Sequence, residues 1–300
     1  MTTRHLTKKI KTLSQQHFAL RRGKQALLEL IDEAEVAESV YNSNAIENST
    51  LTLQETEKIL LQLELSRKVS VRELFEAKNL ARVMAYKRDK ARRPAALDRR
   101  LLLLLRAMLL GGIADRIAGR LRPAGEYVRV GSYIAAAPEQ IEPMAADIMV
   151  AVILTAYRAD MDGCLIDKIA KFHLDFETVH PFCDGNGRSG RVLLNFQLLT
   201  LGLPRIIIRN TEKQTYYKAF GDCHAQGSTA AMAKIIALAV LESLRKCLSY
   251  LQAEHIVRLS DYIKQHKLSA PALINAARRQ TIPAFREQGV WKIGRDYRPA

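Results

Sequence analysis

The stretch that decides the fold is His180-Pro-Phe-Cys-Asp-Gly-Asn-Gly-Arg-Ser-Gly-Arg191. At its centre, Gly185, Asn186 and Gly187 allow backbone conformations in which successive N–H groups converge on one anion. An apolar helical pattern resumes at Val192, so the loop opens a helix whose N-terminus adds partial positive charge. The stretch therefore predicts a phosphate-binding loop.

The charged side chains of this stretch supply the chemistry of a transfer site. Arg188 and Arg191 are three residues apart, so both guanidinium groups project from one side of the first helical turn, where they suit phosphate oxygens. Asp184 stands just before the glycine turn, and a carboxylate beside phosphates is typical of a Mg²⁺ site. His180 can take a proton from an incoming hydroxyl at neutral pH. Together these residues indicate phosphoryl or nucleotidyl transfer.

The same stretch fits HxFx(D/E)GNGRxxR at every defined position, so the chain resembles the Fic family. The preceding helix, with Phe172-His173 and Phe176-Glu177, is similar to the family as well. The resemblance implies a protein adenylyltransferase that moves AMP from ATP onto a Ser, Thr or Tyr hydroxyl of a target protein. It implies His180 as the catalytic base and Asp184 as the ligand of Mg²⁺.

The resemblance also implies the nucleotide contacts. The phosphates would lie on the glycine turn and its two arginines, with the β-phosphate at the first arginine and the γ-phosphate at the second. A downstream helix with two tyrosines resembles the family's helix near the adenine. The ATP-binding residues expected in this way are Asp184, Gly185, Asn186, Gly187, Arg188, Arg191, Tyr216 and Tyr217.

A second motif lies upstream of the loop. Ser43-Asn-Ala-Ile-Glu47-Asn48 resembles the family's inhibitory motif, (S/T)xxxE(G/N). Ser43 and Glu47 are four residues apart and share one helix face. A carboxylate brought to Arg191 would form a bidentate pair and keep that arginine from the γ-phosphate. The resemblance implies a self-inhibited enzyme in which Ser43, Glu47 and Asn48 form the inhibitory element.

Apolar periodicity predicts a mainly α fold. The resemblance implies that this fold is a Fic-fold helical bundle with a short β-hairpin flap, followed by a small winged-helix module. A polar stretch over 41–52 interrupts the first helical pattern, and Thr52 with Glu55 forms a capping box for the next helix. The expected helices cover about 13–40, 53–65, 71–88, 97–113, 144–158, 166–179, 215–225 and 229–251, and a further helix follows the Gly-rich turn and ends at 201. The expected domains are 1–95, an N-terminal helical region; 96–252, the catalytic core; and 253–300, the C-terminal module.

A hairpin is expected from Tyr127 to Ala137, where the family carries a flap that aligns the target by strand addition. Its expected target contacts are Arg129, Val130 and Gly131. The fit is partial, because the family often has Arg directly after the aromatic residue and here Val128 stands there. An ordinary surface hairpin is the alternative.

The chain is strongly basic, with a formal net charge of +15, so its surface attracts polyanions. Residues 258–300 hold nine Lys or Arg against three Asp or Glu, and ARRQTIPAFREQGVWKIG is similar to excisionase-like winged helix-turn-helix domains. Two uses of this module stay open: DNA binding, and protein contacts or dimerisation. The candidate phosphate contacts are Arg278, Arg279, Arg286 and Lys292.

The bulk features set further expectations. The four cysteines show no metal-like spacing, and no apolar run is long enough to span a bilayer, so we expect a cytoplasmic protein without a membrane segment. Helical surfaces are compatible with a homodimer, although no residue identifies one. Two alternatives to the enzyme remain: a DNA-binding regulator whose pocket senses ATP or modifies only itself, and a transferase that moves another nucleotide or a phosphate.

Overall fold

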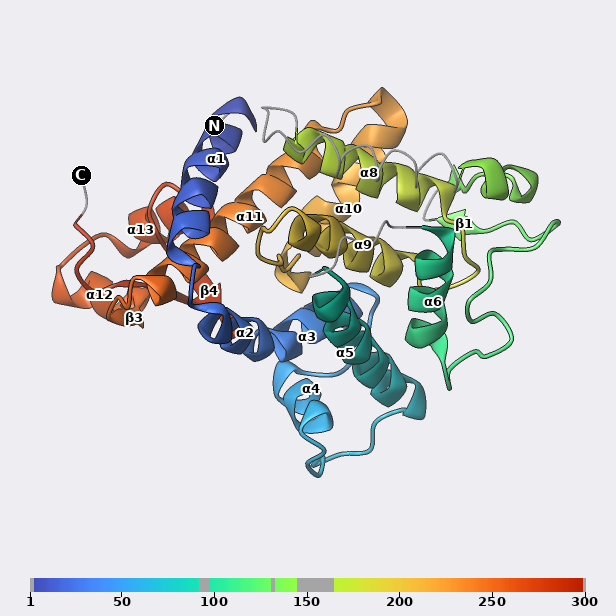
Figure 1. Cartoon of the computed structure of the whole chain (residues 1–300), viewed down its shortest axis with the longest axis horizontal. Coiled ribbons are helices and arrows are strands. Elements are labelled where there is room, and N and C mark those ends of the chain that lie inside the picture. The colour runs from blue at the N-terminus through green and yellow to red at the C-terminus, as the bar shows by residue number, and fades with distance from the viewer. Residues whose placement is uncertain (1–2, 92–97, 131–132, 145–164, 299–300) are drawn as a thin grey trace. The chain divides into compact units, whose positions relative to one another are not determined.

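The computed structural model describes residues 3–91, 98–130, 133–144 and 165–298. Within these ranges the chain is mainly helical, with one two-stranded hairpin and one three-stranded sheet (Figure 1). The predicted mainly α fold class is therefore confirmed. The helix expected over 144–158 falls almost wholly outside the described residues, and the three-domain division of the sequence stays a prediction.

The chain divides into two compact units. The loop unit, residues 36–201 and 207–233, contains α3 (Val36–Ile46), α4 (Leu53–Leu60), α5 (Val71–Ala91), α6 (Arg99–Leu110), β1 (Arg129–Val130), β2 (Tyr133–Ile134), the 3₁₀ turn Pro138–Gln140, α8 (Leu165–Val179), α9 (Asn186–Thr200), the 3₁₀ turn Asn210–Glu212 and α10 (Lys213–Gln226). The terminal unit, residues 1–35, 202–206 and 234–300, contains α1 (Thr3–Leu20), α2 (Gln25–Ala34), most of α11 (Ala230–Leu251), β3 (Ile256–Arg258), α12 (Leu259–Gln265), α13 (Ala270–Arg278), β4 (Phe285–Glu287) and β5 (Val290–Gly294).

Helix α9 is the centre of the loop unit (Figure 1). Helices α3, α5, α6 and α8 all pack against it, and Val192, Leu193 and Phe196 join the unit's main hydrophobic core. Because neighbours surround α9, its sequence shows no one-sided apolar stripe. Its first-turn arginines, Arg188 and Arg191, are buried as a result.

The N-terminal region differs from the single helix expected over 13–40. It forms three helices, and α3 continues through the polar stretch to Ile46. Two buried polar side chains of α3 have partners there: Asn42 donates to the Glu38 carbonyl and accepts from the Asn210 N–H, and Glu38 pairs with Arg209. Polarity here indicates buried hydrogen bonds rather than a loop.

Several other sequence expectations are confirmed. The capping box at α4 is complete, since Thr52 accepts from the Glu55 N–H and the Glu55 carboxylate accepts from the Thr52 N–H. In the terminal unit, helices α12 and α13 precede the hairpin β4–β5, which turns at Gln288 and Gly289. Strand β3 completes an antiparallel sheet of order β3-β5-β4. No helix in the described part of the chain is both long enough and apolar enough for a membrane crossing.

Candidate active site

The loop between α8 and α9 is held open by its own hydrogen bonds. Gly185 caps α9 with a left-handed backbone of φ 69°, which glycine adopts without steric cost. The side-chain amide of Asn186 accepts from the Phe182 N–H at 2.9 Å and donates to the Phe182 carbonyl at 2.7 Å. Phe182 is completely buried. The Asn186 side chain therefore fixes the conformation of the loop. Because the N-cap residue is Gly185, no side chain at that position caps the backbone N–H groups in the first turn of α9.

His180 follows the end of α8, and its imidazole is mostly buried and neutral. Its Nδ1 lies 3.2 Å from the Glu177 carbonyl oxygen, which can only accept, so Nδ1 carries the ring proton and Nε2 keeps a lone pair. Burial, assisted by the positive charge of Arg122, lowers the pKa of His180 to about 4. The ring is thus a ready proton acceptor at neutral pH.

Arg122 ties the His180 backbone to the start and end of the hairpin region. Its guanidinium donates to the carbonyls of His180 at 2.8 Å, Glu126 at 2.8 Å and Ala136 at 2.9 Å, and to that of Val179 at 3.2 Å. The Arg122 side chain is buried. The sequence did not reveal this residue, because nothing distinguishes it locally from the other arginines nearby.

Arg191 is occupied by two residues of the upstream motif. Its Nη2 donates to Glu47 Oε1 at 2.8 Å and to the Ser43 carbonyl at 2.8 Å, and its Nε donates to Ser43 Oγ at 3.0 Å. The expected contact of Glu47 with Arg191 is present, but it uses one carboxylate oxygen, and Ser43 supplies the other acceptors in place of a bidentate pair. Burial is the largest single influence and by itself would lower the pKa of Arg191, but the charge and hydrogen bond of Glu47, together with Tyr216 and Glu177, outweigh it and raise the pKa.

Asn48 ends α3 and sets the position of Glu47. Its backbone is left-handed, with φ 69°. The Ser49 N–H donates to the Asn44 carbonyl and the Asn48 N–H donates to the Ala45 carbonyl, which together form a Schellman cap. Left-handed conformations favour glycine and, next, asparagine. This explains why a residue of the type Gly or Asn follows the glutamate, and it holds Glu47 at the last turn of the helix.

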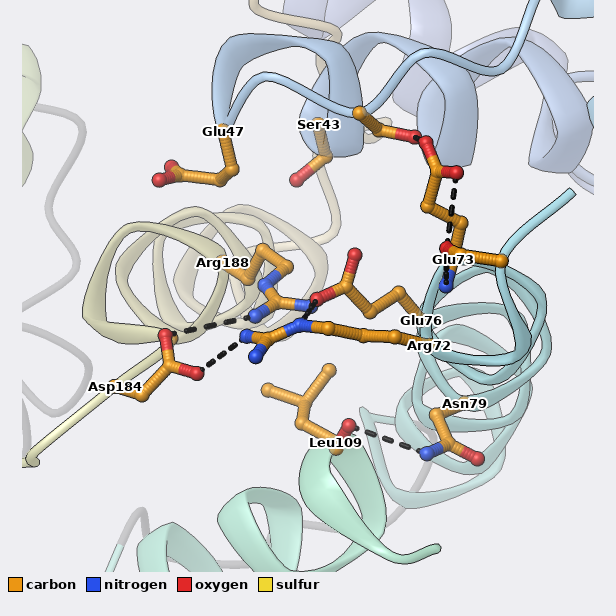
Figure 2. Close-up of polar contacts among 12 residues, drawn as sticks. Ser43, Glu47, Arg72, Glu73, Glu76, Asn79, Leu109, Asp184 and Arg188 are labelled. Atoms are coloured by element: carbon orange, nitrogen blue, oxygen red, sulfur yellow. Dashed lines mark hydrogen bonds and ion pairs between the residues drawn. The ribbon is translucent and has the colours of Figure 1, made fainter. Parts of the chain in front are cut away.

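Asp184 and Arg188 are held by two residues of α5, as Figure 2 shows. Arg72 Nη2 donates to Asp184 Oδ2 at 2.6 Å, and Arg188 Nη1 lies 3.0 Å from Glu76 Oε1. Arg72 and Glu76 also contact one another at 3.0 Å. Burial alone would raise the pKa of Asp184, but the hydrogen bond from Arg72 and the charge of Arg188 hold it below its ordinary value. Sequence reasoning missed both α5 residues, because an i, i+4 ion pair usually marks a solvated helix face.

The residues around Asp184 fit a magnesium ion bound with a nucleotide. The carboxylate is ionised and partly exposed, and hard oxygen donors of this kind suit Mg²⁺. Within the described ranges, no group of three or more His, Cys, Asp or Glu side chains is arranged to hold a metal ion alone. Phosphate oxygens would therefore have to supply further ligands beside Asp184.

The two tyrosines of α10 have different surroundings. Tyr216 is buried, and its hydroxyl lies 2.6 Å from Nε2 of His173. Tyr217 is 42% exposed and donates to the Ile46 carbonyl at 3.1 Å, next to the inhibitory motif. Tyr216 thus supports the wall of the site from inside, whereas Tyr217 is partly exposed and has the Lys213 ammonium over its ring, 5.6 Å from the centroid.

The hairpin is present where the sequence predicted it. Arg129 pairs with Ile134, and Val130 pairs with Tyr133, in antiparallel register. Arg129 is exposed, as are the rings and chains of Tyr127 and Ile134 nearby. Gly131, the third expected target contact, lies outside the described residues.

The basic residues of the terminal unit fall into two groups. Arg278 and Arg279, at the end of α13, are exposed. Arg286 pairs with Glu242 at 2.7 Å and covers the Trp291 ring, while Lys292 pairs with Glu287. Two of the four candidate phosphate contacts are therefore already engaged within the unit.

Comparisons with known proteins agree with this geometry. Residues 96–198 match the model of the Fic/DOC family. Over 240 residues the chain is 28% identical to protein adenylyltransferase fic-1 of Caenorhabditis briggsae, covering 79% of this chain and 43% of that protein. A Fic domain containing signaling protein from Bacteroides thetaiotaomicron VPI-5482 superposes with a TM-score of 0.72 at 22% identity, over 81% of this chain and 97% of that one.

A Fic family protein from Desulfovibrio desulfuricans G20 superposes over 98% of this chain and 97% of its own, with a TM-score of 0.66 at 18% identity. These structural likenesses show a shared fold. The chain spans less than half the length of the curated relative that it matches. The matched region contains His180, the phosphate-type loop and the start of α9 with both arginines. Residues 96–198 of the chain therefore carry a Fic/DOC domain.

Proposed function

We propose that the chain is a protein adenylyltransferase, which transfers AMP from ATP to a hydroxyl side chain of a target protein and is inhibited by its own Glu47. The observation that carries this proposal is the meeting of three features at the start of α9. A neutral His180 lies beside the uncapped first turn, and Arg191 in that turn is occupied by Ser43 and Glu47. The names of the curated relatives support the choice of AMP as the group that moves.

In this proposal the first turn of α9 receives the ATP phosphates. Its free N–H groups and partial positive charge attract the anion, and Arg188 and Arg191 contact the β- and γ-phosphates. Asp184 would hold Mg²⁺ after releasing Arg72, and the metal would neutralise phosphate charge. Tyr217 presents its exposed face to the adenine, while Asn186 keeps the loop in shape.

The transfer step needs one proton acceptor and an aligned oxygen. His180 Nε2 accepts the proton of the target hydroxyl as that oxygen forms a bond to the α-phosphorus. The bond between the α-phosphorus and the bridging oxygen breaks, and pyrophosphate leaves with its electron pair. Because the protein supplies positioning and charge, the geometry of His180 relative to the α9 turn is decisive. An extended target segment would add to the hairpin strand at Arg129 and Val130.

Inhibition follows from competition for Arg191. While Glu47 and Ser43 occupy its donors, the γ-phosphate lacks its partner, and the nucleotide cannot take the productive orientation. The Glu47 carboxylate also repels phosphate, because both are negative and both lie against the same helical turn.

The test uses ATP labelled separately at its α- and γ-phosphates, with Mg²⁺ and four purified proteins: unmodified, Glu47→Gly, Glu47→Gly with His180→Ala, and Glu47→Gly with Arg120→Lys. Arg120 is an exposed arginine that serves as the control. We expect α-label on the protein itself or on added targets in the Glu47→Gly and control forms, and none without His180. Transfer of the γ-label would instead show phosphoryl transfer, and no label in any form would refute the enzyme.

A second function, nucleic-acid binding by the terminal unit, rests on a separate observation. The order α11, β3, α12, α13, β4, β5 with sheet order β3-β5-β4 is that expected of a winged helix, and Arg278 and Arg279 are exposed at the end of α13. With a chain charge of +15, this supports DNA as a partner. The alternative is that the module contacts protein. A regulator that senses ATP or modifies only itself would combine both functions.

A further inference from the structure

Arg106, in the middle of α6, is a buried arginine without a hydrogen-bond partner among the described residues. Only 1% of it is exposed, and none of its three side-chain nitrogens has a partner in the described part of the chain. Its guanidinium covers the ring of Phe182 at 4.8 Å from the centroid. A buried charge normally has a carboxylate or several carbonyls around it, because an unpaired one is costly.

The guanidinium of Arg106 points at the phosphate-type loop. A β-carbon added to Gly185 would lie 2.8 Å from Arg106 Nη1 and 3.5 Å from Arg188 Nη2. Both guanidinium groups therefore lie on the side of Gly185 where a side chain would stand, next to the residue that caps α9. Asn79 holds α6 in place here, since its amide donates to the carbonyls of Leu109 and Gly111 (Figure 2).

The other charges of the site are matched in pairs. Arg188 faces Glu76, Arg191 faces Glu47, and Asp184 faces Arg72. His180 and Glu177 are both neutral at pH 7, because burial lowers the pKa of the imidazole to about 4 and raises that of the carboxyl to about 8. Burial lowers the pKa of Arg106 to about 10, which leaves it charged at neutral pH. Among these groups Arg106 supplies the excess positive charge.

We propose that Arg106 is a third arginine of the phosphate subsite, and that it acts beside Arg188 to favour ligands with two or more phosphates. The inference rests on the proposed nucleotide function. The guanidinium of Arg106 is buried next to Gly185 and Arg188 at the start of α9, and a buried charge interacts with a nearby phosphate more strongly than a solvated one does. The Fic motif does not include this residue, because it comes from a different helix.

The experiment measures binding in the Glu47→Gly background, where Arg191 is free to meet phosphate. Calorimetry measures the affinities for ADP, inorganic pyrophosphate and adenosine. It compares the protein that retains Arg106 with the Arg106→Met and Arg106→Lys variants, and Arg100→Met is an exposed control on the same helix. We expect Arg106→Met to weaken ADP and pyrophosphate about tenfold or more, with adenosine unchanged. Arg106→Lys, which keeps the charge, should retain most of the binding, and the control should retain all of it.

Thermal unfolding of the ligand-free proteins distinguishes a ligand-binding role of Arg106 from a structural one, because the two roles predict opposite changes in the unfolding temperature of Arg106→Met. If Arg106 serves ligands, Arg106→Met removes an unpaired buried charge and should unfold at the same temperature or higher. A lower unfolding temperature with equal ADP binding would assign a structural role and overturn the inference. Equal loss of ADP binding in the Arg106→Met and Arg106→Lys variants would also overturn the inference, because the shape of the arginine rather than its charge would then determine the affinity. If the Glu47→Gly protein itself binds no nucleotide, the proposed function fails instead.

Discussion

The carboxylate of Glu47 lies directly over Gly187, the second residue of α9. A β-carbon added to Gly187 would lie 2.2 Å from Glu47 Oε1 and 3.1 Å from Arg191 Nη1. The carboxylate therefore fills the space against the first helical turn, where a helix N-terminus binds phosphate. Glu47 and a nucleotide phosphate compete for one volume as well as for one arginine.

This overlap predicts an order of nucleotide affinities. Glu47→Gly removes both charge and volume, whereas Glu47→Gln keeps the volume and removes the charge. We expect ATP with Mg²⁺ to bind most tightly to the glycine form, less tightly to the glutamine form and least tightly to the unmodified protein. The total span should be about tenfold or more, which corresponds to about 1.4 kcal/mol. Calorimetry measures the order, and equal affinities for the three proteins would show that Glu47 does not occupy the phosphate position.

Asn48 provides a second and independent way to release Glu47. Its left-handed backbone ends α3, so a β-branched residue there should cost about 1–2 kcal/mol, while glycine should not. We expect Asn48→Val to lower the unfolding free energy in urea and to raise self-modification with labelled ATP, because the last turn of α3 loosens. Asn48→Gly is the matched control, since both variants lose the hydrogen bond from Lys213. If Asn48→Val and Asn48→Gly show the same stability and the same self-modification, the left-handed backbone at residue 48 does not determine the position of Glu47.

Arg122 predicts a loss of rate without a loss of nucleotide binding. Arg122→Lys cannot donate to four carbonyls, so the His180 backbone and the hairpin region lose their common anchor. In the Glu47→Gly background we expect kcat to fall about tenfold while KM for ATP stays nearly constant. Arg120→Lys, an exposed neighbour, should change neither value. A rise in KM with kcat preserved would place Arg122 in nucleotide binding instead.

The chemistry of the site was readable from the sequence because it lies in one continuous segment. Spacing within 180–191 predicts a loop, a helix start and two arginines on one side, and the structure has all three. The contact of Glu47 with Arg191 crosses 144 positions, and it was predicted only because a family motif links them. Residues whose role depends on packing alone, such as Arg122 and Arg106, carry no local signal.

The fold was predictable in outline because the periodicity of a helix is also a local property of the sequence. Apolar periodicity gives the order and approximate positions of most amphipathic helices. It merged three N-terminal helices into one, and it fails where a helix is surrounded or where polar residues are buried. Helix α9 has no exposed face, and α3 buries Asn42 and Glu38 against partners from a distant segment. Only the tertiary contacts make those polar residues helical, so the expected break over 41–52 was wrong for its first part.

Glu177 predicts an unusual dependence of stability on pH. Burial raises its pKa to about 8, so the native state keeps a proton that the unfolded state releases above its ordinary pKa. Between roughly pH 4.5 and 8 the native state binds more protons, so the unfolding free energy falls as the pH rises, by at most about 1.4 kcal/mol per pH unit. Glu177→Gln cannot ionise, and it should gain stability relative to the unmodified protein as the pH rises from 5.5 to 7.5.

Urea unfolding at pH 5.5, 6.5 and 7.5 gives the difference between these two proteins. His173 and His180 have lowered pKa values, of about 3 and about 4, so both destabilise the native state on the acid side of their ordinary pKa. They are present in both proteins and largely cancel in the difference, which isolates the carboxyl. Parallel curves for the two proteins would show that Glu177 is ionised in the native state.

The exposed arginines of α13 predict how the terminal unit binds a polyanion. If Arg278 and Arg279 contact phosphates, replacing both by Ala should weaken binding to duplex DNA in a gel shift and reduce the slope of log affinity against log salt by about two. Arg286→Ala is the informative contrast, because Arg286 already pairs with Glu242 and covers Trp291. Its loss should lower the unfolding temperature and leave the salt slope unchanged. DNA binding that is absent, or insensitive to salt, in the unmodified protein would assign the module to protein contacts.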